Sequence, residues 1–496
     1  MIGKIRWRSS LCPSGAAPEN LCSPPVPNRS ATNLFRAEVS TLGRPPERGC
    51  PHSSINEPVV KMFNSPRPRL FLASCVLLSL AAHSGRAEDV FWTNPAGGNW
   101  TVAANWSANR VPGGEDQVFI TLAGTYTVTL NAAAVIAALT VGGGSGAQTF
   151  TTGSQNLTIG GPAMVGSNGV FALSGGSLNS AYDLTVQGAL AWTGGLMSGA
   201  GRTIIAGGAT AALGGAGTKG LDAGRVLENR GTVLWTGGTI DLNDLAVGGS
   251  GRVENTAAGL LDIQLAGGTL RASGYPDVGT APLPGLANAG TLRRSAGGDD
   301  VSLAVPFTNT GTVEVLAGIL NATSLVTITP ESRFRFVLGG PSLGGGHVQF
   351  RVGGSLTLRG TVEFALANGF MPADGQEFTI ISAGSLVGTF SDALGNVLPN
   401  AVFLNPIYTS REVIVRTQDG RPILQTRIGS PGSQFRLNGV AGQTYRIHAA
   451  ADLGVQDWTL LATIRLSGSG RLDFVDPEAA GFPQRFYLVE FVPHEP

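Results

Sequence analysis

The sequence predicts an all-β protein: a right-handed parallel β-helix, which is a solenoid, followed by a small antiparallel β-sandwich. The first reason is repetition, because the phrase at Trp192–Gly195 returns 43 residues later at Trp235–Gly238. A second phrase, Asn229–Val233, returns 59 residues later at Asn288–Leu292 and after a further 21 at Asn309–Val313. These intervals fit two, three and one copies of a unit of about 20 to 21 residues, which is in the range typical of stacked repeats.

Composition and local pattern support the same fold class. Glycine accounts for 72 of 496 residues, about twice the usual ~7%, and charged residues for only 13%. Runs of four or five residues such as Tyr126–Leu130 and Asn156–Ile159 alternate apolar with small or polar side chains and are bounded by Gly, Ser or Asn, which is the strand signal. An array of β-sandwiches is the alternative, and it would show longer strands joined by antiparallel hairpins.

The first 87 residues contain a pattern typical of export. From Met62 the chain has Arg67 and Arg69, an apolar run at Leu70–Ala82 and a small-x-small cleavage site at Gly85–Ala87, as in a secretory signal peptide. The apolar run is about 13 residues, too short for the ~20 that span a bilayer. We therefore expect residues 62–87 to be a signal peptide, residues 1–61 to be a non-native leader or a disordered segment, and the product to be secreted or held at the cell surface.

Charge and cysteine content bound the chemistry of the exported part. Residues 88–496 hold 22 basic and 29 acidic residues, a net charge of −7, which argues against a nucleic-acid partner. All four cysteines precede residue 88: Cys12, Cys22, Cys50 and Cys75. Disulfides, a thiolate nucleophile and cysteine-ligated zinc are thus excluded from the predicted mature chain, and no transmembrane segment is expected in it.

Residues 88–120 are predicted to form an N-terminal cap. Trp92, Trp100 and Trp106 lie close together in the sequence and could either plug the end of an apolar core or offer a platform for carbohydrate. Solenoids need their terminal apolar face covered, which favours the plug. With Pro112 and Asp116, these residues resemble the opening segment W-x-x-x-x-x-G-x-W…N-W…P-x-x-x-D-x-V-x-I of exported bacterial β-helix proteins.

Residues 121–418 are predicted to be β-helix repeats, with longer strands from Ser332 onward. The strings Gly369–Pro372, Gly375–Ile381 and Gly388–Phe390 resemble the closing coils of autotransporter passenger domains. That resemblance implies the fold and nothing about activity, and no outer-membrane barrel follows in this sequence.

Residues 419–496 have less glycine and are predicted to form the C-terminal β-sandwich. Five strand runs, separated by closely and regularly spaced turn signals, lie between Gln434 and Val489. The strings Gly442–Ile447, Asp452-Leu453 and Gln484–Tyr487 resemble the immunoglobulin-like or fibronectin-like modules that end large exported bacterial proteins. The resemblance implies adhesion, spacing or sorting.

The sequence offers few candidates for chemistry. Only His347, His448 and His494 lie beyond the signal, far apart in sequence, and we expect core or surface roles for them. Asp299 and Asp300 with Arg294 could supply acid–base groups, as on polysaccharide-degrading β-helices, but we favour a solvated corner loop as the explanation of these charges.

No metal or other cofactor is expected. The stretch Gly248–Val253 approximates a calcium-binding nonapeptide, but Val253 stands where the motif needs aspartate.

Two functional hypotheses remain. The first is a secreted or surface protein with a structural or adhesive role and no catalysis, in contact with polysaccharide or extracellular matrix. The alternative is a β-helix that binds carbohydrate through Trp92, Trp100 and Trp106 or degrades polysaccharide with Asp299, Asp300 and Arg294.

Overall fold

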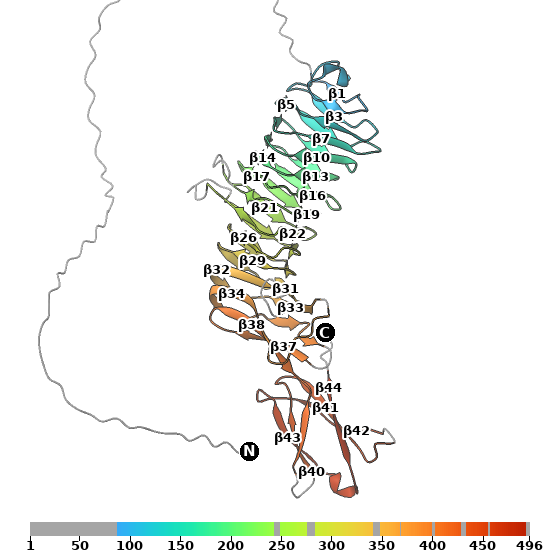
Figure 1. Ribbon diagram of the computed structural model, residues 1–496, viewed down its shortest axis with the longest axis vertical. Helices are drawn as coiled ribbons and strands as arrows, with labels where there is room; N and C mark the ends of the chain where they lie inside the picture. Colours follow the sequence, from blue (N-terminus) through green and yellow to red (C-terminus); the bar gives the residue numbers. More distant parts are fainter. Residues whose placement is uncertain are drawn as a thin grey trace, which may run out of the picture. The chain divides into compact units, whose positions relative to one another are not determined.

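The computed structural model describes residues 87–242, 249–274, 283–340, 348–367, 369–398, 402–427, 433–454 and 457–492. Three long sheets run side by side along the first part of the described chain, and two short antiparallel sheets follow (Figure 1). The predicted fold class is confirmed. The expected leader, residues 62–86 of the expected signal peptide and the four cysteines lie outside the described residues.

Two of the long sheets are parallel throughout. Sheet 1 consists of β1 (Asp89–Phe91), β3 (Gln117–Ile120), β6 (Ala138–Val141), β9 (Ala163–Val165), β12 (Leu184–Val186), β15 (Arg202–Ile205), β18 (Val226–Asn229), β21 (Arg252–Asn255), β24 (Gly285–Asn288), β27 (Phe307–Asn309) and β30 (Val326–Ile328). Sheet 2 consists of β2 (Gly98–Asn99), β4 (Tyr126–Thr129), β7 (Gln148–Thr151), β10 (Gly169–Leu173), β13 (Ala189–Trp192), β16 (Thr210–Leu213), β19 (Thr232–Trp235), β22 (Leu260–Ile263), β25 (Thr291–Arg294), β28 (Thr312–Val315), β31 (Arg333–Leu338), β33 (Thr361–Leu366) and β35 (Asp392–Leu394).

The remaining long sheet, sheet 3, changes direction near its end. Its strands, from one edge to the other, are β5 (Ala134–Ile136), β8 (Asn156–Ile159), β11 (Ser177–Asn179), β14 (Gly195–Ser198), β17 (Lys219–Asp222), β20 (Ile240–Asp241), β23 (Gly268–Arg271), β26 (Asp300–Leu303), β29 (Ile319–Ala322), β32 (Gln349–Thr357), β34 (Glu377–Val387), β38 (Glu412–Asp419), β37 (Val402–Tyr408) and β36 (Val397–Leu398). Pairing is parallel up to β34, after which β38, β37 and β36 pair antiparallel. Most strands from β31 onward are longer, as predicted, but β35 and β36 remain short.

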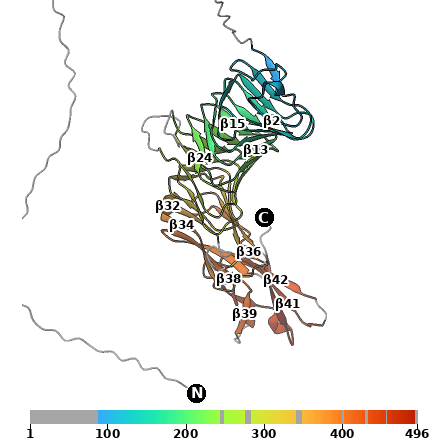
Figure 2. The same cartoon turned by 45° about the horizontal axis from the view of Figure 1, so that its top comes forward.

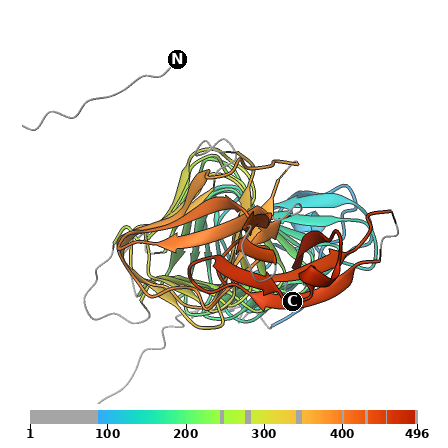
Figure 3. The ribbon, with the colours of Figure 1, turned by 90° about the horizontal axis from the view of Figure 1, so that it is seen from below.

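Successive coils stack in register. Trp192 pairs with Leu213 of the next coil, and Leu213 pairs with Trp235 of the coil after that. The two tryptophans therefore occupy equivalent places two coils apart, as their spacing in the sequence predicted. Both are buried, because alternate side chains of each strand point inward and form one continuous core. Figure 2 and the end-on view of Figure 3 show the coils overlying one another.

The repeated Asn-x-Gly phrase forms a ladder inside the solenoid. Asn229, Asn255, Asn288 and Asn309 end four successive strands of sheet 1 and are 0–2% exposed. Each Nδ2 of the first three donates to Oδ1 of the next asparagine, over 2.7, 2.7 and 2.6 Å. The interval from Asn229 to Asn288 is thus two coils and not three, because the coils starting at Asn229 and Asn255 are longer than the coil starting at Asn288.

Glycine in the same phrase is required by a close approach of two coils. A Cβ on Gly290 would lie 2.2 Å from the carbonyl oxygen of Thr256, and one on Gly311 would lie 2.3 Å from that of Gly290. Neither contact can relax without moving backbone, so a side chain at either position would separate the coils.

The C-terminal module consists of two three-stranded antiparallel sheets. Sheet 4 contains β39 (Ile423–Arg427), β40 (Ser433–Asn438) and β43 (Arg471–Asp476), and sheet 5 contains β42 (Thr459–Arg465), β41 (Thr444–Ala450) and β44 (Phe486–Val492). Short 3₁₀ turns occur at η1 (Ala103–Asn105) in the cap and η3 (Ala479–Gly481) in the module. In the module core the hydroxyl of Tyr445 accepts from the amide of Val440 at 2.8 Å and donates to the carbonyl of Gly420 at 3.2 Å. The sequence predicted the other five strands but not β39.

Candidate functional site

The three tryptophans of the cap lie together at the N-terminal end of the core. Trp92, Trp100 and Trp106 are only 2%, 1% and 2% exposed. The Trp106 ring packs edge-on against both others, with ring centroids 4.9 Å from Trp92 and 4.7 Å from Trp100, and its Nε1 donates to the Trp100 carbonyl at 2.8 Å. In this geometry the rings cover the end of the core, and none presents a face on which a sugar could stack.

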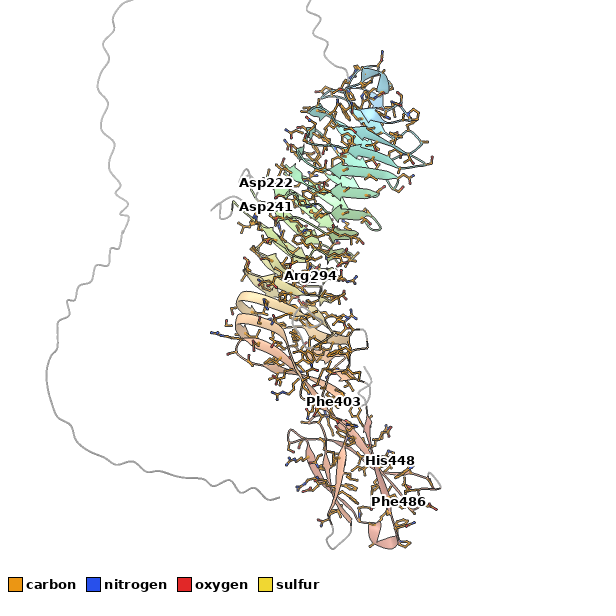
Figure 4. All side chains as sticks on the ribbon, in the orientation of Figure 1. Asp222, Asp241, Arg294, Phe403, His448 and Phe486 are labelled. Carbon is orange, nitrogen blue, oxygen red and sulfur yellow. The ribbon has the colours of Figure 1, made fainter. Side chains whose placement is uncertain are left out.

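The candidate acid–base residues Arg294 and Asp300 are engaged in structural contacts. Arg294, on β25, is fully buried and donates to main-chain carbonyls, from Nη1 to Leu265 at 2.5 Å and from Nη2 to Asp299 at 2.8 Å. Burial lowers the pKa of its guanidinium, although the charges of the nearby aspartates oppose that shift. The Asp300 carboxylate is exposed and pairs with Arg351 at 3.1 Å. Arg294, which is labelled in Figure 4, thus holds main-chain carbonyls of a corner together from within.

Two further buried cations, which the sequence analysis did not single out, act in the same way. Lys219 Nζ donates to the carbonyls of Gly217 and Gly237 at 2.9 Å each, and burial lowers its pKa to about 8. Arg225 Nη1 donates at 3.0 Å to the carbonyl of Ser180, and burial lowers the pKa of Arg225 to about 10. Both groups remain charged at pH 7. They satisfy main-chain carbonyls at corners of the coils, and for Lys219 these carbonyls belong to glycines.

The outer face of sheet 1 is continuous over all eleven strands of the sheet. One column of outward side chains crosses the whole sheet in unbroken register: Phe91, Phe119, Thr140, Met164, Thr185, Ile204, Glu228, Glu254, Ala287, Thr308 and Thr327. We call this set the outer column. Its first six members are uncharged, and the rings of Phe91 and Phe119 stack with centroids 4.8 Å apart. Phe91 and Met164 are 42% and 41% exposed, so apolar surface faces solvent here.

Three shallow hollows lie along this face. One of about 340 Å³ is lined by residues of β3, β6, β9 and β12, including Phe119, Thr140 and Met164. Two others, of about 350 and 310 Å³, lie over β21, β24 and β27 and share Ala287 and Thr308. Alanine and threonine side chains contribute to the lining of all three, beside larger ones such as Phe119, Leu283 and Arg252. The face therefore offers a row of shallow, weakly charged depressions parallel to the axis of the solenoid.

Ion pairs divide the outer column in the middle. Arg202 pairs with both Glu228 and Glu254, Arg230 pairs with Glu228, and Arg252 lies 3.7 Å from Glu254. Burial alone would raise the pKa of the Glu228 carboxyl, but hydrogen bonds from Arg230 and Arg202 hold it below its ordinary value. These side chains are thus paired with one another within the sheet. The hollow over β3, β6, β9 and β12 has no charged lining residue, whereas Glu254 and Arg252 line the two hollows over β21, β24 and β27.

The other candidates are placed as follows. His448 lies on β41 with Nε2 3.4 Å from Glu490 Oε2, while His347 and His494 lie outside the described residues. Val253, in the stretch that approximates a calcium motif, is buried in β21. Within the described ranges no three histidine, aspartate or glutamate side chains gather as a metal site would require. Nor does the part of the chain that the structure describes contain a helix long and apolar enough to span a membrane.

The outer column could have been found from the sequence only after the coil lengths were known. Its members are unevenly spaced along the chain, and a one-residue error in register would place the buried face outside. Comparisons with protein-family models, with curated proteins and with solved structures found no match for this chain.

Proposed function

We propose that the protein is a secreted or cell-surface structural protein whose solenoid serves adhesion without catalysis, and that the outer face of sheet 1 is its contact surface. The observation that carries the proposal is the outer column with its row of hollows. Parallel strands hold this face rigid over eleven coils, so an extended partner can be engaged at several points at once. The candidate residues Arg294 and Asp300 are engaged in structural contacts, which supports a role other than catalysis.

Export can be tested directly. The full chain is expressed in a bacterial host, the cells are fractionated, and the N-terminus of the product is determined by mass spectrometry. We expect the product in the extracellular or surface fraction with Glu88 as its first residue. A cytoplasmic product that retains residues 1–61 would contradict the proposal.

Adhesion is tested with two variants that place a charge on different faces. Met164→Lys introduces an ammonium into the hollow over β9, and Val135→Lys introduces the same group on sheet 3, where Val135 is 56% exposed. Binding of the purified protein to immobilised matrix and polysaccharide preparations is then compared. We expect Met164→Lys to weaken binding about tenfold or more, because the charge loses water on contact, and Val135→Lys to leave it unchanged. Equal effects of both variants would refute the assignment of the face.

Carbohydrate binding on the same face is the second candidate function. The stacked and partly exposed rings of Phe91 and Phe119 favour it, because they lie beside threonine hydroxyls that can donate and accept hydrogen bonds. Phe119→Ala should then abolish binding to polysaccharide while leaving binding to protein matrix intact. The reverse result would favour a protein partner.

A further inference from the structure

The C-terminal module contains a hollow of its own at one end of sheet 5. It measures about 310 Å³ and is lined by Ala449–Ala451, Asp452, Asp457, Thr459, Phe482 and Arg485. This size is at the lower end of the range for small-molecule sites, enough for one small ligand or one unit of a polymer. The lining combines a small apolar floor, an aromatic ring and charged groups of both signs.

Arg485 is held under the hollow with part of its hydrogen-bonding capacity unused. Its side chain is only 8% exposed, and Nε lies 3.1 Å from Oδ2 of the buried Asp476. Nη2 lies 3.6 Å from Glu478 Oε2, whereas Nη1 has no hydrogen-bond partner among the described residues. A buried donor without a partner is costly, and in native proteins it is explained by strain, by a role in chemistry, or by a bound water, ion or ligand.

The other polar groups of the hollow complement this donor. Asp452 and Asp457 are both exposed, and neither forms an ion pair with another described residue. Asp452 Oδ1 accepts a hydrogen bond from the Gly454 amide at 2.8 Å, which leaves its second oxygen available. The lining of the hollow therefore combines exposed carboxylate acceptors with Arg485, whose buried Nη1 is unpaired among the described residues.

Phe482 supplies an apolar wall. The guanidinium carbon of Arg485 lies 4.2 Å from the centre of the ring, which fixes the ring in place through a cation–π contact. The ring remains 42% exposed, so part of its surface is available to a ligand.

We propose that this hollow binds a neutral saccharide residue. A hydroxyl group both donates and accepts, so adjacent hydroxyls of one sugar can accept from Arg485 Nη1 and donate to Asp452 and Asp457. The C–H face of the sugar ring packs on Phe482. The site is distinct from the outer column of sheet 1 and does not depend on the function proposed for it.

Charge argues against acidic ligands, and hydrogen bonding argues against simple ammonium ligands. Four carboxylates, Asp452, Asp457, Asp476 and Glu478, surround the single guanidinium of Arg485, so the local charge is negative and an acidic sugar or phosphate is repelled. A simple ammonium ligand matches the carboxylates but provides no acceptor for Nη1, and would leave that donor unpaired.

The test uses the full purified chain on an array of neutral, acidic and amino-sugar oligosaccharides, with D-glucose, D-galactose and D-mannose as soluble competitors. Asp457→Asn and Phe482→Ala change exposed residues, so folding is preserved, and each should weaken binding of a neutral glycan roughly tenfold. Asp392→Asn and Val475→Ala are matched controls, an exposed carboxylate and an exposed apolar side chain outside the hollow, and should leave the affinity unchanged. Labelled alanine methyl groups at Ala449–Ala451 should shift in the NMR spectrum on addition of the sugar.

Three outcomes would overturn the proposal. The first is no binding of any neutral saccharide on the array or in solution. The second is binding that Asp457→Asn and Phe482→Ala do not weaken relative to their controls. The third is a preference for acidic or ammonium-bearing ligands. Loss of binding in Phe119→Ala, with the two module variants unaffected, would assign the glycan to sheet 1 instead.

Discussion

Removing one asparagine from the interior ladder should destabilise the solenoid by several kcal/mol. In Asn255→Ala, Asn288 Oδ1 loses the donor at 2.7 Å. One N–H of Asn229 Nδ2 loses its acceptor at 2.7 Å, while the other N–H keeps the Leu260 carbonyl at 2.9 Å. The carbonyls of Thr291 and Gly259 lose donors at 3.0 and 3.2 Å as well. A buried group left unsatisfied costs about 1–3 kcal/mol, so two orphaned side-chain groups give about 2–6 kcal/mol before the carbonyls are counted.

The matched control is Asn405→Ala. Asn405 also donates to a side chain, Gln418 Oε1 at 2.9 Å, but that bond is exposed, so water replaces it and the cost should stay below about 0.5 kcal/mol. Urea unfolding followed by circular dichroism gives the midpoint for each variant, and hydrogen exchange by mass spectrometry locates the loss. We expect exchange to accelerate in the coils next to residue 255, because each coil contacts only its neighbours. A cost for Asn255→Ala well below the range given by its two orphaned groups, or equal costs for both variants, would refute the reasoning.

The remaining predictions concern the buried cation, the cap and the charges on sheet 2. Burial lowers the pKa of Lys219 to about 8, so between pH 8 and about 10.5 the unfolded chain binds one more proton than the folded chain. Raising the pH through this window should therefore stabilise the wild type relative to Lys219→Met, and the difference between their urea midpoints is measured at pH 7.5 and 9.5. A difference between the midpoints that does not change with pH would contradict a lowered pKa for Lys219. Trp106→Ala should lower the free energy of unfolding by about 3–5 kcal/mol and accelerate hydrogen exchange in the first coils only. Uniform acceleration of hydrogen exchange along the solenoid would argue against a capping role for Trp106. Glu314 lies between Arg293 at 2.6 Å and Arg335 at 3.6 Å; Glu314→Gln should therefore cost up to about 1 kcal/mol at low salt, less in 1 M NaCl, and a salt-independent effect would show that pairing is not the cause.

The fold could be predicted from the sequence because the inward pattern repeats. Trp192 and Trp235 mark the same inward position of sheet 2, and an aromatic ring that fits one coil fits an equivalent coil. The number of coils between Asn229 and Asn288 could not be predicted, because it depends on how long the chain runs outside the strands. Those excursions leave no trace in the strand pattern.

The candidate sites were less predictable, since a residue type does not reveal which way its side chain points. From the sequence, Arg294 resembles a surface charge next to two aspartates. Its position in β25 instead directs its side chain into a corner, where main-chain carbonyls accept hydrogen bonds from its guanidinium. Arg485 likewise reads as part of a motif, while its burial and its unpaired nitrogen depend on β43 and β44 meeting across the module. The direction of each side chain depends on the three-dimensional fold. From the sequence, only the alternation of inward and outward residues within a strand could have indicated it.

The unequal lengths of the coils have a consequence for how such a protein can change over evolutionary time. The chain takes a longer path from Asn255 to Asn288 than from Asn288 to Asn309, yet the amide-to-amide contact is 2.7 Å in the first case and 2.6 Å in the second. A mutation that lengthens one excursion is therefore accommodated locally and does not shift the layers above or below. Natural selection can therefore change the loops of one coil at a time while the strands of the three sheets stay in register.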